Sequence, residues 1–307
     1  MLLRNKSKQA KSAKDNSANS ACPLLDLPEF VLESILRRLS PYHLCQLAQT
    51  SKDLRKRCRR DEIWEPLYKE RWGKIAGMNA FDLWRRLLFQ RDSWILESKL
   101  IKAVPVIRPN EVFVNLYWQL ECGEFWFPGQ VFRQQGHAGF EACYDAILEY
   151  DRNSDTFRAR YLSRSASNIV NGISWERIRK PPVMTSPSEL YIPDVLNELR
   201  PGDHIEIQWR MNQNWPYEWW YAIVGHADNC ISENQNCSCH LDEMFWIEFR
   251  QYPVGSTWRR FQIRRNRATE VGSASDGFYG GIRKLTNMED INAWLQPSLE
   301  SDGQWSF

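Results

Sequence analysis

The sequence lacks any long apolar segment, since no run approaches the roughly 20 apolar residues that a membrane-spanning helix needs. Its N-terminal stretch is basic but has no apolar core region, so a secretory signal is not expected. The eight cysteines are irregularly placed. In a chain without a secretory signal they are expected to be reduced thiols, which predicts a cytoplasmic or nuclear protein.

The sequence also lacks the motifs of common active sites. It contains no G-x-S-x-G, no H-E-x-x-H and no evident nucleophile–base pair, and its five histidines are scattered. The Gly-rich "DGFYGG" (276–281) is not followed by Lys-Ser/Thr, so it is not a phosphate loop. The net charge of +2 gives no general reason to expect nucleic acid. We therefore expect a protein that is not an enzyme and binds no cofactor.

What the chain does have is 15 tryptophans and two changes of character along its length. Helical periodicity comes first and short alternating strands follow, which predicts an α+β protein. The predicted segments are a disordered basic tail (1–21), a helical domain (22–72), a linker helix region (73–104), two β units (108–182 and 198–268), and a Gly-rich loop with a C-terminal helix (269–307).

The helical domain carries a surplus apolar stripe. Val31, Leu32, Ile35, Leu36 and Leu39 recur at helical spacing. Ser40 and Pro41 then read as the N-cap and first residue of a second helix, which contains Leu44. A few short helices cannot bury all their apolar surface against one another. We therefore expect the apolar stripe to contact a partner protein.

The same residues resemble the F-box. Its signature is matched by Leu27-Pro28, Ile35-Leu36, Leu39 and Trp64, although "TSKDL" departs from the usual third helix. The resemblance implies docking onto the Skp-type adaptor of a cullin-containing ubiquitin ligase, with Ile35 and Leu36 at the centre of the interface. The adaptor-binding residues it implies are Leu27, Pro28, Val31, Leu32, Ile35, Leu36, Leu39, Leu44 and Trp64. The alternative is a subdomain that packs only on its own C-terminal region.

A longer helix is predicted over 79–98. Phe81, Trp84, Leu87, Leu88 and Ile95 lie near one of its faces. We expect it to bridge the F-box-like part and the next domain.

The β region contains a weak internal repeat. "EFWFPGQVF" (124–132) is echoed by "EWWYAIVG" (218–225), and an acidic-aromatic strand and a basic strand follow each. This order resembles Tudor/Agenet domains, which implies two small barrels. The whole Trp-rich C-terminal region resembles that of a plant F-box subfamily.

A target-binding site is predicted around Trp215, Tyr217, Glu218, Trp219 and Tyr252. Several rings beside a carboxylate would form a cage for a cation, such as a methylated Lys or Arg of a target protein. The alternatives are that these rings pack within the fold, or that they dock a proline-rich peptide.

One cluster of metal-ligand residue types falls in "CISENQNCSCH" (230–240). Cys230, Cys237, Cys239 and His240, with His226 nearby, are of the types that hold tetrahedral zinc. The spacing C-x6-C-x-C-H is not that of a standard finger, and its last three ligand positions are crowded. We therefore predict a polar loop with no metal.

The sequence as a whole predicts a substrate receptor, whose F-box docks to the adaptor while the β region binds the target. The alternatives are a reader of peptides or modified residues outside a ligase, and a binder of single-stranded nucleic acid. Phosphate binding would weaken steeply with salt, whereas cage recognition would not.

Overall fold

A computed structural model describes most of the chain from Pro23 to Leu295. The described residues are 23–89, 100–102, 108, 110–134, 140–161, 169–183, 185–192, 196–228, 230 and 237–295. The predicted tail (1–21) lies outside them, as does the second half of the predicted 79–98 helix with Ile95. The chain divides into two compact units, Met1–Ile63 and Trp64–Phe307.

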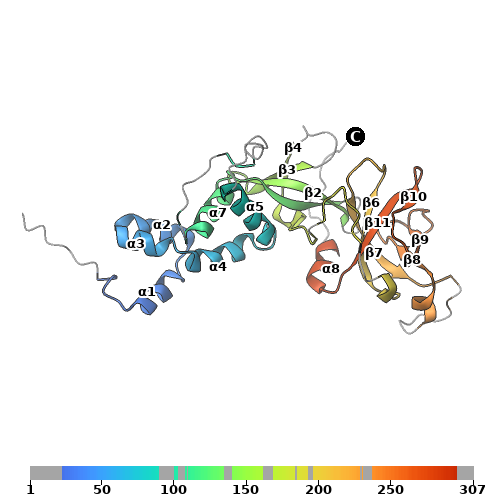
Figure 1. Ribbon diagram of the computed structural model, residues 1–307, viewed down its shortest axis with the longest axis horizontal. Helices are drawn as coiled ribbons and strands as arrows, with labels where there is room; N and C mark the ends of the chain where they lie inside the picture. The colour runs from blue at the N-terminus through green and yellow to red at the C-terminus, as the bar shows by residue number, and fades with distance from the viewer. Residues whose placement is uncertain are drawn as a thin grey trace, which may run out of the picture. The chain divides into compact units, whose positions relative to one another are not determined.

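The first unit is built from short helices. They are α1 (Glu29–Leu36), α2 (Pro41–Thr50), α3 (Lys52–Cys58) and the start of α4 (Asp61–Trp72) (Figure 1). Serine residues fix two of the helix starts, because Ser40 Oγ accepts from the His43 N–H and Ser51 Oγ accepts from the Leu54 N–H at 3.1 Å. Pro41 occupies the first turn of α2, as the sequence predicts.

The second unit begins within α4, and its further helices among the described residues are α5 (Gly77–Phe89), α7 (Val112–Glu121) and α8 (Met288–Leu295). Aromatic side chains of α4 pack against α7 and against the sheet. Trp64 meets Tyr117 of α7 edge-on, with ring centroids 5.3 Å apart, and Trp72 meets Phe127 of the sheet at 6.2 Å. Within the described residues no helix is long and apolar enough to cross a bilayer.

The strands of the second unit form one 11-stranded antiparallel sheet. They are β1 (Phe127–Gln134), β2 (Phe140–Asp151), β3 (Thr156–Tyr161), β4 (Ile169–Ile173), β5 (Ile178–Arg179), β6 (His204–Arg210), β7 (Glu218–Gly225), β8 (Met244–Glu248), β9 (Arg260–Arg264), β10 (Val271–Ser273) and β11 (Gly277–Lys284). The main path is β10-β11-β6-β7-β2-β1-β5, with β3–β4 and β8–β9 as branches. In the part of the chain that the structure describes, the 3-10 turns η1 (Trp175–Arg177), η2 (Leu196–Glu198) and η3 (Ser238–Leu241) lie between strands.

The α+β class is confirmed, but the prediction of two closed barrels is wrong. Strand β2 is long enough to pair with β1 and β3 and also to place Ala142 and Cys143 opposite Trp220 and Trp219 of β7. The two predicted β units are therefore joined into one open sheet.

Two segments have a different secondary structure from the predicted one. Val112–Glu121 is helix α7, although it falls in the predicted first β unit. Gly277–Lys284, predicted as a Gly-rich loop, is strand β11, and it pairs with β6. The glycines allow a close approach here, because a Cβ on Gly281 would lie 1.6 Å from the Tyr191 carbonyl oxygen.

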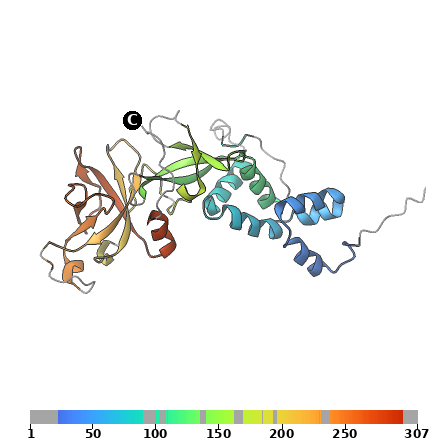
Figure 2. The same cartoon turned by 180° about the vertical axis from the view of Figure 1, so that it is seen from behind.

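Both faces of the sheet are buried around β7. Alternation places Trp220, Ala222 and Val224 in one apolar cluster and Trp219, Tyr221 and Ile223 in another. Helix α8 covers the second face through Ile291 and Trp294, and it lies beside the strands in both ribbon views (Figure 1, Figure 2).

Candidate functional site

The apolar stripe of the first unit is divided between core and surface. Leu32, Leu36 and Leu44 are buried, whereas Val31, Ile35 and Leu39 are half-buried and Pro28 is exposed. Leu32, Leu36 and Leu44 thus pack mainly within the chain, and their predicted contact with the adaptor stays a prediction.

Solvent instead reaches three apolar side chains around the starts of α1 and α2. Phe30 is 75% exposed, Tyr42 is 64% exposed, and Leu27 is also exposed. The F-box resemblance identified Leu27, but the sequence analysis missed Phe30 and Tyr42, because both lie off the apolar stripe. The available signal was an aromatic residue at a position where helical spacing requires a polar one.

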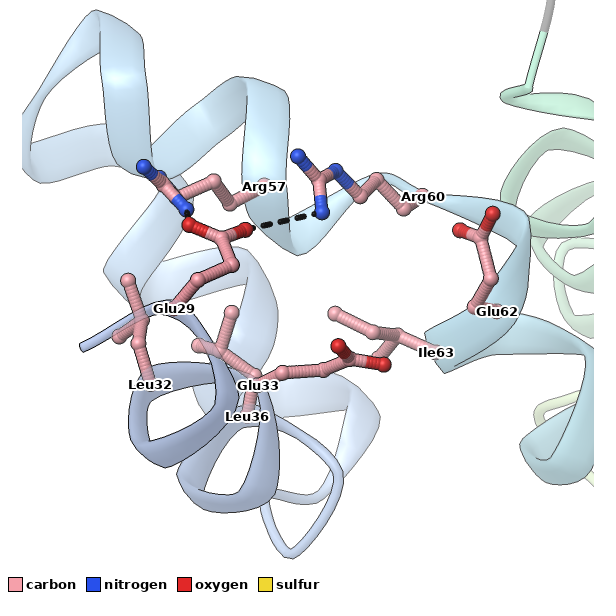
Figure 3. A pocket seen from close by; sticks show the side chains of 8 residues that line it. All are labelled: Glu29, Leu32, Glu33, Leu36, Arg57, Arg60, Glu62 and Ile63. Carbon is pink, nitrogen blue, oxygen red and sulfur yellow. Dashed lines mark hydrogen bonds and ion pairs between the residues drawn. The ribbon is translucent and has the colours of Figure 1, made fainter.

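A groove opens beside α1, with an apolar floor and a charged rim (Figure 3). It is lined by Glu29, Leu32, Glu33, Leu36, Arg57, Arg60, Glu62 and Ile63. Glu29 accepts hydrogen bonds from Arg57 and, at 3.1 Å, from Arg60. The hydrogen bond from Arg57 and the two positive charges lower the pKa of Glu29, which ties the start of α1 to the end of α3.

Trp64 belongs to the second unit and is fully buried there, with its ring also near Trp118 of α7. In this structure the side chain predicted to contact the adaptor packs within the chain instead. A buried ring wedged between other aromatic side chains stabilises the fold and offers no surface to a partner.

The residues predicted to form an aromatic cage do not converge. The Tyr217 ring is buried beneath the chain's own cation, Arg210, whose guanidinium carbon lies 4.2 Å from the ring centroid. The Tyr217 hydroxyl donates to Glu270 Oε2 at 2.6 Å. Trp219 is buried on the face that α8 covers, where its ring lies 5.8 Å from that of Tyr191.

The remaining members of the predicted cage are also separated. Glu218 Oε1 accepts from the Trp220 indole N–H at 2.6 Å, and Tyr252 packs beside Trp220 on the opposite face from Trp219. Trp215 is 47% exposed in the connection between β6 and β7. The cage prediction is wrong because strand alternation divides the rings between two covered faces, and Trp215 alone of the five stays largely exposed.

The predicted metal-ligand residues meet in a different combination. The ligand atoms of His226, Cys230, Cys237 and Cys239 all lie within 4.8 Å of one another. His240 is turned away from this group, with its Nδ1 2.8 Å from the Cys237 carbonyl oxygen.

The helices of the first unit and the start of α4 correspond to a known class of domain. A model of the F-box domain matches residues 24–66. An F-box domain implies an adaptor-binding role in an SCF-type ubiquitin ligase complex, and F-box proteins are generally non-catalytic substrate adaptors.

The similarity extends well beyond the domain. The chain is 43% identical to F-box protein At2g26850 of Arabidopsis thaliana over 306 residues, covering 90% of this chain and 82% of the relative. It is 38% identical to F-box protein At2g41170 of the same plant over 323 residues, covering 94% of this chain and 87% of the relative. The chain belongs to the F-box proteins, and its relatives are plant proteins.

Proposed function

We propose that this protein is the substrate-recognition subunit of an SCF-type ubiquitin ligase. The first unit docks onto the Skp-type adaptor and through it onto the cullin, while the second unit binds the target. The observation that carries the proposal is an F-box match whose helices leave Leu27, Phe30 and Tyr42 in solvent. Holding the target beside the ligase raises the effective concentration of its lysines, so the receptor needs no chemistry of its own.

The adaptor contact is assigned to the exposed aromatic and apolar side chains, together with half-buried Val31, Ile35 and Leu39. Full burial of a Phe side chain contributes about 1.5–3 kcal/mol, so Phe30 has the most to gain at an interface. A charge at that position would be desolvated without a partner, which opposes binding.

The target contact is assigned to the connection between β6 and β7. Met211 and Trp215 are both exposed there, and Met and Trp are residue types enriched at protein interfaces. The cytoplasmic or nuclear location expected from the sequence is compatible with both contacts.

The proposal is tested by affinity purification of the tagged full-length chain from plant cells. Phe30→Asp should lose the adaptor and the cullin but keep the target, whereas Trp215→Ala should lose the target but keep the adaptor. Val254→Asp is the matched control, since Val254 is exposed in the second unit and should change neither.

Two outcomes contradict the proposal. Recovery of the adaptor with Phe30→Asp at the control level would exclude the proposed docking face. Recovery of nucleic acid that falls steeply with salt, in place of a protein target, would favour a different function for the second unit.

A further inference from the structure

The group formed by His226, Cys230, Cys237 and Cys239, here called the Cys3His cluster, lies where two paired strands are connected. His226 directly follows β7, and η3, which contains Cys239, precedes β8. The paired strands bring Gly225 opposite Trp246. The two halves of the cluster are thus close in space because the sheet holds the ends of the connection together.

The distances within the cluster match those of a tetrahedral metal site. His226 Nδ1 lies 3.4 Å from the Sγ atoms of both Cys230 and Cys237. Zn–S bonds of about 2.3 Å and Zn–N bonds of about 2.0 Å place neighbouring tetrahedral ligands about 3.5 Å (N to S) to 3.8 Å (S to S) apart. Ligand atoms within 4.8 Å of one another therefore need little adjustment to share one ion.

The backbone brings the ligands together by local turns. The Cys230 N–H donates to the Ala227 carbonyl at 3.0 Å, which returns Cys230 toward His226. The Ala227 N–H lies 3.5 Å from Cys239 Sγ and donates to it. This contact holds the Cys239 sulfur beside the turn that carries His226 and Cys230.

Arginine side chains hold the backbone of two ligands in place. Arg265 is buried and donates to the Leu196, Asp242 and Cys239 carbonyls at 2.6, 2.9 and 3.4 Å. Arg260 Nη2 donates to the His226 carbonyl at 3.0 Å. Contacts of this kind, one layer beyond the ligands, orient the ligating groups and support metal affinity.

The structure removes the objection that the sequence raised. Crowding in Cys237-x-Cys239-His240 disfavours a site made from those residues, but His240 is directed at a carbonyl instead. The imidazole comes from His226, at the far end of the connection.

We propose that the Cys3His cluster binds one zinc ion as a structural site. Three thiolates and one imidazole complete a tetrahedral shell and leave no position for water or substrate, so the ion would fasten the β7–β8 connection and take part in no reaction. This inference is independent of the proposed docking and target contacts.

The first test is elemental analysis of the full-length chain after purification without chelators. About one zinc per chain is expected for the wild type. Cys237→Ser/Cys239→Ser and His226→Gln should fall to background, while the matched controls Cys122→Ser and His240→Gln should keep the metal. Wild-type protein at background, or zinc retained in the double variant, overturns the proposal. Zinc lost with His240→Gln but kept with His226→Gln overturns the ligand assignment.

A second test keeps the proposal falsifiable if the variants fold poorly. Wild-type chain stripped of metal under reducing conditions is titrated with Co²⁺, and the intense visible bands of tetrahedral thiolate coordination should saturate at one equivalent. Their absence overturns the proposal. The free thiols are also counted in metal-free protein isolated without reductant. Two thiols fewer than in fully reduced protein would identify a disulfide and would also overturn the zinc proposal.

Discussion

The carboxylate of Glu206 in β6 is fully buried at the junction of four elements, and its loss is the most informative perturbation of the second unit. It meets Arg179 Nη1 of β5 at 2.5 Å and Arg283 Nε of β11 at 3.2 Å. It also accepts the indole N–H of Trp294 in α8 at 2.5 Å. Glu206→Gln keeps the shape of the side chain but removes the charge that both arginines face.

The expected cost follows from what the two arginines lose. Removing one partner of a buried ion pair typically costs about 3–5 kcal/mol, because the other charge stays buried. Arg179 keeps Gln130 Oε1 at 2.8 Å and Arg283 keeps Asp290 at 3.4 Å, so we expect the lower end, about 3 kcal/mol. For a unit of this size that corresponds to a fall in Tm of about 6–12 °C.

All 15 tryptophans lie in the second unit, so tryptophan fluorescence follows its unfolding alone in thermal and urea denaturation. Glu289→Gln is the matched control, because Glu289 forms an exposed ion pair with Lys74 at 3.4 Å and should contribute less than about 0.5 kcal/mol. Equal stability of the two variants would refute the reasoning.

The same contacts predict a pH dependence. Burial by itself raises the pKa of Glu206, but the charges of Arg179 and Arg283 and the hydrogen bonds outweigh it, so its pKa is lowered. A carboxyl whose pKa lies below the unfolded value of about 4.3 stabilises the fold above that pH and loses this contribution as the pH falls further. The difference between wild type and Glu206→Gln should therefore be complete at pH 7 and shrink below about pH 4. A difference that stays constant to pH 3 would contradict this.

Two further perturbations follow from the second unit. Burial raises the pKa of Asp145 to about 6, so Asp145→Asn should stabilise the unit by about 1–2 kcal/mol at pH 7. This gain should vanish below the unfolded pKa of about 3.9. A loss of stability in Asp145→Asn at pH 7 would exclude this cause. Tyr217→Phe removes the hydrogen bond to Glu270 and should lower the free energy of unfolding by about 1.5–3 kcal/mol in urea denaturation. Trp215→Ala should change it by less than about 0.5 kcal/mol, because Trp215 is largely exposed. Similar values for both variants would contradict the burial assigned to the two rings.

Local sequence rules predicted the parts of the fold that depend on nearest neighbours. Ser40 and Pro41 start α2 because an N-cap and a first-turn proline act within a few residues. Alternation along Glu218–Gly225, which is also a local pattern, divides the side chains of β7 between two apolar clusters. The F-box resemblance rested on such local features and was confirmed.

The predictions that failed depended on contacts distant in sequence. The segment "VFVNLYWQLE" is rich in β-branched and aromatic residues, yet its packing on Trp64 and Tyr68 makes it helix α7. The number of sheets was decided by the β2–β7 pairing, which no local pattern encodes. Trp219 is buried because α8, some seventy residues away in the chain, packs against the same face of the sheet.

The central claim, docking of the first unit onto a Skp-type adaptor, is tested most directly by titration calorimetry of the purified full-length chain with purified adaptor. The account predicts a 1:1 complex that Phe30→Asp weakens at least about tenfold, which corresponds to 1.4 kcal/mol, while Val254→Asp leaves the affinity unchanged. Leu36→Asp is unsuitable for this purpose, because Leu36 is buried and a charge there would disturb the fold of the unit itself. No complex with the wild type, or equal affinity for wild type and Phe30→Asp, would contradict the claim.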